Sequence, residues 1–265
     1  MHQQTSEILY NNLVGNGYYK IALTCDSAYA NAAAGQFVTL KIPGSMDPLL
    51  RRPFSIHRLL FENKKAAALE ILYRVAGGFT GQMSKLRKTE TVDLLGPLGR
   101  GFTIFPNMKK PLLAAGGIGV APMVFLAESL EAAGIDLFCA PVFLGGKTAS
   151  DILCENDFNR FSMEVNITTE DGSRGLKGIV TEPLEAWIKK QKPDIMYVCG
   201  PHGLLHAAAG IAAKHNIRCE VSVETVMACG IGVCMGCAVK TKDHLQGYRH
   251  ICKDGPVFDA SVLMF

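Results

Sequence analysis

Four cysteines near the C-terminal end of the chain are the residues whose types and spacing point most directly to chemistry. They follow the pattern C-x4-C-x2-C-x14-C within 24 residues. Three thiols this close together cannot all form unstrained disulfides. Their thiolates can converge on a metal, and an x4, x2 spacing followed by a later cysteine is typical of plant-type [2Fe–2S] sites. The four are Cys229, Cys234, Cys237 and Cys252.

The glycines between these cysteines favour the same interpretation. Gly230, Gly232 and Gly236 let the backbone take left-handed conformations, which bring N–H groups close to the sulfurs. Two alternatives remain open at this stage. A structural zinc site also takes four cysteines, usually as two close pairs, whereas here three lie together and one stands apart. The cysteines could also be ordinary buried residues.

The other five cysteines are dispersed, and most suit the role of a small buried apolar residue. A total of nine is odd, and the N-terminus has no basic start followed by an apolar run. Both observations argue against a secreted disulfide framework, so we expect a reducing, cytoplasmic environment. The dispersed cysteines are Cys25, Cys139, Cys154, Cys199 and Cys219.

Composition and charge exclude several classes of protein. Hydrophobic residues make up 48% of the chain and charged residues 19%, which is enough apolar material for a buried core. The 27 basic and 24 acidic residues leave a net charge of +3 with no basic run, so we expect no nucleic-acid partner. The longest uncharged apolar run, Pro111–Ala127, is 17 residues long and rich in glycine, so we expect no membrane span.

Two glycine-bearing turns could hold a dinucleotide. Gly116, Gly117 and Gly119 connect an apolar run to a predicted helix, where a diphosphate can approach the free N–H groups of the helix N-terminus. Cys199–Pro201 ends a later strand of the same predicted sheet, and ligands of such sheets bind at the carboxyl ends of the strands. Either turn alone could serve packing, but together they predict a nucleotide crevice.

A third candidate is Arg51–Ile56, which reads Arg-Arg-Pro-Phe-Ser-Ile. Taken alone, it could be an ordinary edge strand. As a binding segment, it would pair Arg52 with a phosphate, pack Phe54 on a ring and let Ser55 hydrogen-bond a ring nitrogen.

The elements that must position these residues fall into three parts. Residues 1–103 show short apolar runs separated by turn-prone residues, which predicts a small β-barrel or sandwich. One helix is expected within it over Gly81–Arg87, with Thr80 as the N-cap. The expected strands are Tyr19–Leu23, Phe37–Ile42, Phe54–Leu60, Leu69–Val75 and Val92–Leu95.

Residues 104–224 alternate between strand and helix patterns, which predicts a doubly wound parallel sheet with helices on both faces. Residues 225–265 have little helical periodicity, so we predict a small loop-rich module around the metal centre. The expected strands of the middle part are Leu112–Ala115, Leu137–Leu144, Val165–Thr168, Ile195–Cys199 and Cys219–Val223. Its expected helices are Ala121–Ala133, Pro183–Lys190 and Leu204–His215.

The order of the motifs resembles a known superfamily. Arg-Pro-Phe-Ser in a barrel, then Gly-Gly-Ile-Gly-Val-Ala-Pro, then Cys-Gly-Pro is similar to the ferredoxin–NADP reductases, in which a flavin barrel precedes a pyridine-nucleotide domain. With the cysteine module added, the chain looks like the electron-transfer subunits of NAD-linked (class 1B) dihydroorotate dehydrogenases. The resemblance covers nearly the whole chain and implies FAD, a [2Fe–2S] cluster and NAD as cofactors.

The resemblance also implies roles for particular residues. A strand at Leu72, Tyr73 and Arg74 would contact the flavin, and Thr80 would hold the FAD diphosphate. Phe79 stands where the family usually has a glycine, which puts the backbone geometry there in question. Further roles fall on residues already singled out. FAD would be bound by Arg52, Pro53, Phe54 and Ser55, and the NAD diphosphate would be faced by Gly116, Gly117 and Gly119. Cys199 would lie beside the nicotinamide as the candidate catalytic residue, and the cluster would be ligated by Cys229, Cys234, Cys237 and Cys252.

The choice between NAD and NADP is balanced in the sequence. Thr168–Asp171 follows a predicted strand, and acidic side chains there can accept hydrogen bonds from a ribose 2′-hydroxyl and would repel a 2′-phosphate. Arg174 and Lys177 lie close behind and could instead accept that phosphate. The acidic residues favour NAD, and the basic ones weaken the inference.

These signals together predict an electron relay. NAD exchanges a hydride, a [2Fe–2S] cluster exchanges single electrons, and a flavin can do both, so FAD belongs between them. The resemblance implies a partner, an FMN-containing catalytic subunit that oxidises dihydroorotate, in a heterotetramer of two subunits of each kind, within pyrimidine biosynthesis. One alternative is an NADH-dependent reductase component that serves a ferredoxin, an oxygenase or a sulfur substrate. The other is a non-enzymatic binding protein with structural zinc.

Overall fold

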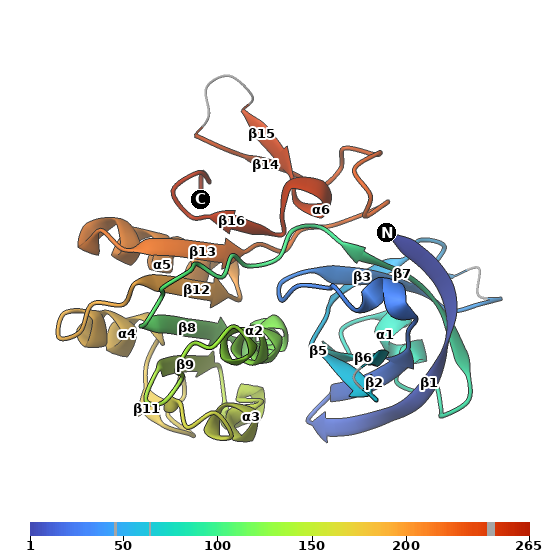
Figure 1. Cartoon of the computed structure of the whole chain (residues 1–265), viewed down its shortest axis with the longest axis horizontal. Helices are drawn as coiled ribbons and strands as arrows, with labels where there is room; N and C mark the ends of the chain where they lie inside the picture. The colour runs from blue at the N-terminus through green and yellow to red at the C-terminus, as the bar shows by residue number, and fades with distance from the viewer. Residues whose placement is uncertain (45–46, 64, 243–246) are drawn as a thin grey trace.

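Seven antiparallel strands form the first sheet, in the order β4-β3-β7-β1-β2-β6-β5. The sheet curls into a barrel on the right of Figure 1. The computed structural model describes residues 1–44, 47–63, 65–242 and 247–265. The strands are β1 (His2–Gly15), β2 (Tyr18–Thr24), β3 (Phe37–Lys41), β4 (Arg52–Ser55), β5 (Arg58–Glu62), β6 (Lys65–Arg74) and β7 (Thr91–Leu98). A short 3-10 turn, η1 (Ser27–Tyr29), precedes β3.

The sequence pattern missed β1, the longest strand of the barrel. Its first half pairs with β7 and its second half with β2. Only Ser6 and Ile8 of this strand are fully buried, so it lacks the apolar run that marks the other strands. The expected strand Phe54–Leu60 is also divided, because Ile56 and His57 leave the ladder between β4 and β5.

The helix within the barrel starts earlier than expected. Helix α1 spans Gly78–Met83, with Gly77 as the N-cap. Thr80 lies inside the first turn, where its hydroxyl oxygen accepts hydrogen bonds from the N–H groups of Ala76 at 2.9 Å and Gly77 at 3.1 Å. The expectation of a helix over residues 81–87 capped by Thr80 is therefore wrong. The glycine pair Gly77–Gly78 lets the helix begin three residues earlier than expected. Thr80 therefore lies inside the helix, and its hydroxyl oxygen accepts from N–H groups that precede it.

The second sheet has the order β11-β10-β9-β8-β12-β13-β16 and lies on the left of Figure 1. Its first six strands are parallel, and the chain moves outward from β8 first to one side and then to the other. The strands are β8 (Pro111–Gly116), β9 (Pro141–Gly146), β10 (Glu164–Thr169), β11 (Leu176–Lys177), β12 (Ile195–Cys199), β13 (Arg218–Ser222) and β16 (Val257–Asp259).

Apolar side chains of these strands alternate between two cores. Leu113 of β8 and Tyr197 of β12 face the core shared with α2, α3 and the barrel. Leu112 and Met196 face the opposite core, which α4 and α5 cover. Strands buried on both faces read as continuous apolar runs, which explains why the sequence located most of them. The expected strand Leu137–Leu144 is half wrong, because β9 begins only at Pro141. The helices are α2 (Ala121–Ala132), α3 (Glu155–Asn159), α4 (Thr181–Ile188) and α5 (His202–His215), and the short turns are η2 (Gly117–Val120) and η3 (Ala149–Asp151).

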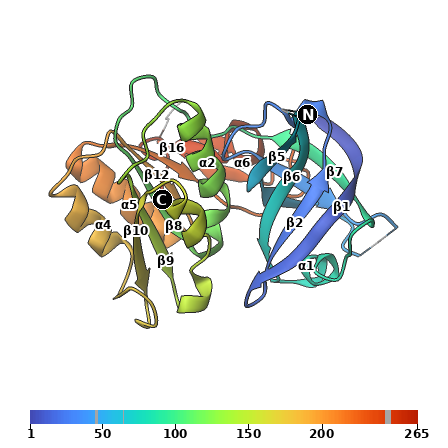
Figure 2. The ribbon, with the colours of Figure 1, turned by 60° about the horizontal axis from the view of Figure 1, so that its bottom comes forward.

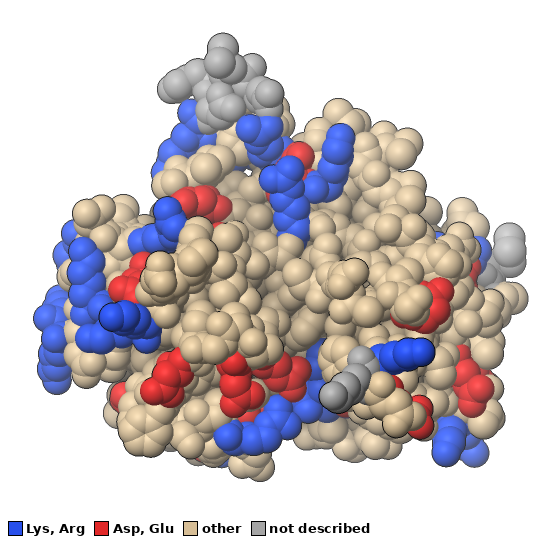
Figure 3. Space-filling view, in the orientation of Figure 1, with Lys and Arg blue, Asp and Glu red and all other residues tan. Residues whose placement is uncertain are grey.

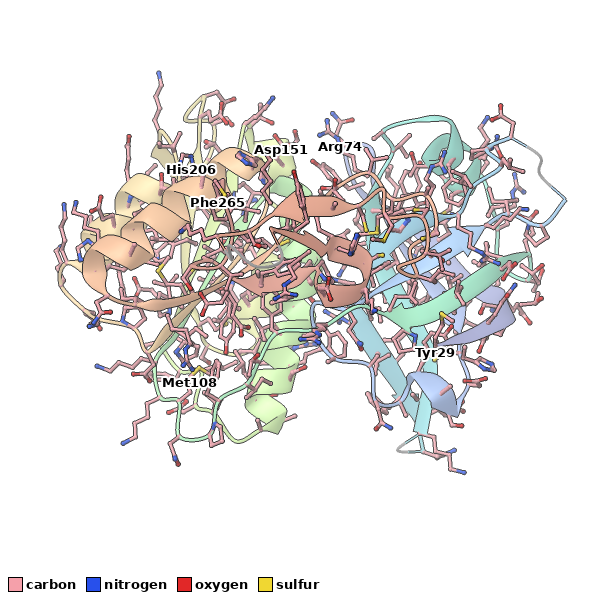
Figure 4. All side chains as sticks on the ribbon, turned by 90° about the horizontal axis from the view of Figure 1, so that it is seen from above. Tyr29, Arg74, Met108, Asp151, His206 and Phe265 are labelled. Carbon is pink, nitrogen blue, oxygen red and sulfur yellow. The ribbon has the colours of Figure 1, made fainter. Side chains whose placement is uncertain are left out.

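The barrel and the parallel sheet meet along a polar seam. Figure 4 labels Arg74 and Asp151, which face each other across it. The hydroxyl of Tyr18 donates to Asp151 at 2.8 Å, and the Arg74 guanidinium lies over the Tyr18 ring. In the view of Figure 2, α2 and α3 lie between the sheet and the barrel.

The C-terminal segment bridges both sheets. Its hairpin pairs β14 (Ala238–Lys240) with β15 (Tyr248–His250), and helix α6 (Ile251–Asp254) follows. Strand β16 then pairs antiparallel with β13 and so extends the parallel sheet. The predicted loop-rich module therefore contains regular elements and shares a sheet with the middle part of the chain. Among the described residues, no helix combines the length and the apolar character needed to cross a membrane.

Candidate functional site

The expected flavin segment is strand β4, at the edge of the barrel sheet. Ser55 pairs with Phe37 of β3, and Pro53 pairs with Thr39. The two arginines differ in their partners. Arg51 forms an ion pair with Asp93, whereas Arg52 donates to the main-chain carbonyl of Leu50 at 2.8 Å. Among the described residues, no carboxylate forms an ion pair with Arg52, which suits a residue that would hold a phosphate.

Phe54 belongs to an aromatic cluster beside this strand. Its ring lies 6.0 Å from Phe79 and 6.1 Å from Tyr73, measured between centroids. Phe79 is buried and lies within helix α1, where its φ is not positive, so this position does not require a glycine. Leu72 and Tyr73 are buried as well, and the Tyr73 hydroxyl donates to the side chain of Asn11. Arg74 alone of the expected second flavin strand is exposed, so Leu72 and Tyr73 belong to the wall of the barrel.

The two glycine-bearing turns pack directly against each other. A Cβ atom on Gly119 would lie 2.4 Å from the carbonyl oxygen of Cys199, and one on Gly116 would lie 2.7 Å from the ring of Pro201. Gly117 differs, because it has a φ of +53° and faces open space. Gly116 and Gly119 thus hold the turns together, and Gly117 presents its backbone to whatever binds there.

Cys199 ends β12 beside these turns. Burial raises the pKa of its thiol to about 12, although a hydrogen bond with Ser222 opposes the shift. The thiol is therefore protonated at neutral pH and is not poised as a nucleophile. It can act at most as a neutral neighbour of a bound ring.

The four clustered cysteines lie on one loop and on α6. The Sγ atoms of Cys237 and Cys252 are 3.2 Å apart, which is too far for a disulfide and close enough for both to bind one metal ion. The Sγ atom of Cys229 accepts from the N–H groups of Ile231 and Cys234 at 3.5 and 3.4 Å. The donors are four soft thiols, and backbone N–H groups point at two of them, Cys229 and Cys252, so the residues fit an iron–sulfur cluster.

Backbone geometry places these N–H groups. Gly230 and Gly232 are left-handed, as expected, but the third left-handed residue is Met235 and not Gly236. The N–H of Gly232 donates to Cys252 Sγ at 3.1 Å. Burial opposes ionisation of Cys229, yet the backbone hydrogen bonds outweigh it and lower the pKa of that thiol to about 6. The loop thus favours a thiolate at its first cysteine before any metal binds.

The cluster loop lies on the barrel next to the flavin segment. A Cβ on Gly230 would lie 3.0 Å from the Thr39 side chain and 3.8 Å from Phe37. Both residues belong to β3, and they pair with Pro53 and Ser55 of β4. Neighbouring strands are about 4.8 Å apart, so one strand separates the cysteine loop from the expected flavin contacts.

His57, which follows the flavin segment by two residues, has a role that no sequence pattern indicated. The side chain is fully buried, and its Nδ1 atom lies 2.7 Å from the carbonyl oxygen of Ala121, where α2 begins. Its Nε2 atom lies 3.6 Å from a carboxylate oxygen of Glu70. Burial lowers the pKa of His57 to about 3, so the ring is neutral and links the barrel to the nucleotide turn.

The fold and the site together define a class of oxidoreductase: a barrel and a nucleotide-binding sheet of the ferredoxin–NADP reductase type, joined to a C-terminal iron–sulfur domain. Two family matches agree with it. Residues 224–264 match "Iron-sulfur cluster binding domain of dihydroorotate dehydrogenase B", and residues 113–210 match "Oxidoreductase NAD-binding domain". These matches confirm the expected fold class and favour an iron–sulfur domain over structural zinc.

The chain belongs to the family of electron transfer subunits of dihydroorotate dehydrogenase B (NAD(+)). A protein of that name from Desulforamulus reducens is 40% identical over 86% of this chain and 85% of its own length. Another, from Caldanaerobacter subterraneus subsp. tengcongensis, is 36% identical over 98% of both chains. These relatives confirm the expected family and the expected class of enzyme, an electron-transfer component of an oxidoreductase.

Solved structures show the same fold. One comes from a study of flavin-based electron bifurcation by an NADH-dependent reduced ferredoxin–NADP oxidoreductase. It has a TM-score of 0.83 and 24% identity, and the match covers 98% of this chain and 89% of that one. A ferredoxin NADP+ reductase from Neisseria gonorrhoeae with bound FAD and NADP has a TM-score of 0.67 and 16% identity, over 81% of this chain and 92% of that one.

Proposed function

We propose that this chain carries electrons from a dihydroorotate-oxidising, FMN-containing partner subunit to NAD+. When bound, a [2Fe–2S] cluster supplies single-electron transfer, and FAD links that to hydride transfer with NAD+. Cys229, Cys234, Cys237 and Cys252 would hold the cluster through their thiolates. The family relatives favour this reading over a reductase component that serves another acceptor.

The observation that carries the proposal is the adjacency of the three sites. The cysteine loop lies on β3, and β4, with Arg52, Phe54 and Ser55, is the next strand. The buried side chain of His57 links the barrel to the start of α2. Helix α2 directly follows, along the chain, the glycine turn that would face NAD. A flavin on β4 would therefore lie between the cluster and the nicotinamide.

On the flavin side, half-buried polar groups of β4 would do the binding. Arg52 would pair with the FAD phosphates and Ser55 would contact the flavin ring, while Phe54, Pro53 and the buried Leu72, Tyr73 and Phe79 would shape the wall behind it. Thr80 would present the first turn of α1 to the diphosphate. On the nucleotide side, Gly116, Gly117 and Gly119 would line the NAD diphosphate site, and Cys199 would lie beside the nicotinamide.

The surface around the cysteine loop suits a docking partner. Cys234 is exposed, and the apolar side chains beside it project into solvent, with Val233 exposed to 74% and Val226 to 86%. In Figure 3, the outer end of this loop is uncharged, and Lys and Arg side chains stand beside it toward the β14–β15 hairpin. Apolar groups exposed together mark interaction sites. We propose that the FMN subunit docks here, in an assembly of two subunits of each kind.

We propose three parts: a flavin barrel over residues 1–103, an NAD domain over residues 104–224 and a cluster module over residues 225–265. We propose a reducing, cytoplasmic location as well, because four of the nine cysteines would hold the cluster as thiolates.

The test is to purify the chain anaerobically with its co-expressed partner and to measure NAD+ reduction by dihydroorotate. We expect NADH formation by the complex and none by this chain alone. Replacing Cys237 with Ser should remove the visible absorbance of the cluster and reduce this activity by at least tenfold, because a thiolate ligand is lost. Cys219→Ser, which alters a buried cysteine outside the cluster, is the matched control. Dihydroorotate oxidation by the isolated chain would overturn the division of labour.

A further inference from the structure

The loop after β10 lies where the adenosine half of a dinucleotide would bind, if the proposed function holds. Strand β8 separates β9 and β10 on one side from β12 on the other, so the direction of winding changes at β8. Ligands of such sheets bind outside the carboxyl ends of the strands at this point. With the nicotinamide beside Cys199 of β12, the adenosine half extends over the ends of β9 and β10.

This loop holds the backbone of Arg174 firmly. The Thr169 hydroxyl donates to the carbonyl oxygen of Arg174 at 2.8 Å and accepts from its N–H at 3.0 Å. The N–H of Asp171 donates to the carbonyl of Lys147, at the end of β9, at 3.2 Å. Gly175 follows with a φ of +68°, where a Cβ would collide with the carbonyl of Ile167. The backbone from which the Arg174 side chain extends is therefore held in place.

That guanidinium forms an ion pair with Glu155, the first residue of α3. Both side chains remain accessible, Arg174 at 43% and Glu155 at 28%. An accessible arginine at this edge would otherwise be well suited to a phosphate, because its planar donors match phosphate oxygens. Glu155 engages one of those donors, the Nη2 group, and adds a negative charge beside the others.

Further carboxylates surround the pair. Glu170 and Asp171 lie on the same loop, and Asp171 accepts hydrogen bonds from the N–H and the hydroxyl of Ser173 at 2.9 and 2.6 Å. These bonds lower the pKa of Asp171, which keeps it ionised. Glu155, Glu170 and Asp171 place three carboxylates at this edge, beside the cations Arg174, Lys177 and Lys147. The carboxylates repel a 2′-phosphate and offer acceptors to a 2′-hydroxyl.

We propose that Glu155 is a specificity-determining residue that selects NAD over NADP by engaging Arg174. The inference rests on the proposed function. The sequence alone left the choice between NAD and NADP open. The ion pair favours NAD, because Arg174, which could accept a 2′-phosphate, is already paired with Glu155.

The test replaces Glu155 with Gln in the cofactor-loaded chain. The ratio of kcat/KM for NADPH to that for NADH, measured with ferricyanide as acceptor, should rise on the order of tenfold, which is the size of one charge-assisted hydrogen bond. Binding of 2′-AMP, measured by calorimetry, should tighten by a similar factor. The double variant with Arg174→Gln should lose both gains.

Glu185→Gln is the matched control. Glu185 has a similar exposure of 25% and pairs with Lys214 on the face covered by α4 and α5, so neither readout should change. Unchanged NADPH preference and unchanged 2′-AMP affinity in Glu155→Gln would overturn the inference, as would a gain that survives in the double variant. If the unaltered chain failed to oxidise NADH, the proposed function would fail, and 2′-AMP binding would still decide the role of Glu155.

Discussion

Gly119 occupies a position that no side chain can fill. Its missing Cβ leaves room for the Cys199 carbonyl, which an added carbon would approach to 2.4 Å, against the backbone of a neighbouring turn. Gly117, two residues earlier, has no atom within 4 Å of its Cβ position. The two glycines look equivalent in the sequence but have different roles. Gly119 allows the two turns to pack together, and Gly117 leaves its backbone accessible to a ligand.

Gly119→Ala should lower the free energy of unfolding by about 1–3 kcal/mol, because the two turns must move apart to admit the methyl group. It should also raise the KM for NADH. Urea unfolding and NADH oxidation with ferricyanide measure the two effects. Gly210→Ala, in open space within α5, is the control, and it should raise stability by about 0.5–1 kcal/mol. Wild-type stability in Gly119→Ala would contradict the packing role.

Part of the site could be predicted from residue types and spacing. The cysteine pattern identified its module, because thiol spacing along a loop constrains which sulfurs can meet. The pairing of Glu155 with Arg174 could not be predicted, since the residues are 19 positions apart on different elements. His57 escaped notice for the same reason, because its partners Ala121 and Glu70 are brought to it by the fold alone.

At the scale of elements, β5 meets α2 and α3 through a half-buried charged junction. Arg58 pairs with Asp157 at 2.7 Å and lies near Glu70 and Glu128, and Lys20 pairs with Asp157 at 3.4 Å. His57 lies fully buried among these groups. The loss of water, together with the nearby cations Lys20 and Arg58, lowers the pKa of His57 and keeps the imidazole neutral.

Stability should therefore fall as the pH drops below about 6.5. The folded pKa of His57 is about 3, against 6.5 for the free side chain, so between these values the unfolded chain takes up a proton that the folded chain refuses. The His57 contribution is about 1.4 kcal/mol per pH unit at most. His57→Gln should have a shallower decline of urea-unfolding stability between pH 6.5 and 4. His206→Gln, at an exposed position on α5, should keep the wild-type slope, and equal slopes in all three proteins would refute the assignment.

The elements predicted best are those buried on both faces. Ile195–Cys199 was predicted to the residue, because a fully buried strand is a continuous apolar run. Strand β1 and the two-residue β11 were missed, since their pairing comes from neighbouring strands and not from an apolar pattern. Helix α3 was missed as well, because five residues are too few to show a helical period.

At the scale of the whole molecule, the cysteine loop joins the two sheets and faces outward. It packs on β3 on one side, and the segment after it completes the parallel sheet on the other. Its outer surface exposes apolar side chains around Cys234. The cluster module is thus both the connection between the domains and the proposed surface for the partner.

Val233→Asp should weaken association with the FMN subunit by roughly tenfold or more, because a charge at the centre of an apolar contact must be desolvated. NADH oxidation with ferricyanide by the isolated chain should be unaffected, since the side chain points into solvent. Phe138→Asp is the control: this residue is exposed to 70% on the nucleotide domain, away from the loop. Analytical ultracentrifugation of the mixed subunits gives the affinities, and equal loss in both variants would argue for a different docking face.

Strand β16 has a consequence for the synthesis of the chain. It covers the outer edge of β13, whose unpaired N–H and C=O groups would otherwise be open to another chain. Val257 follows Ser222 by 35 residues, so at ribosomal speeds the edge stays bare for roughly 2–7 s in each nascent chain. We expect that interval to be the time at which newly made copies are most prone to pair with one another.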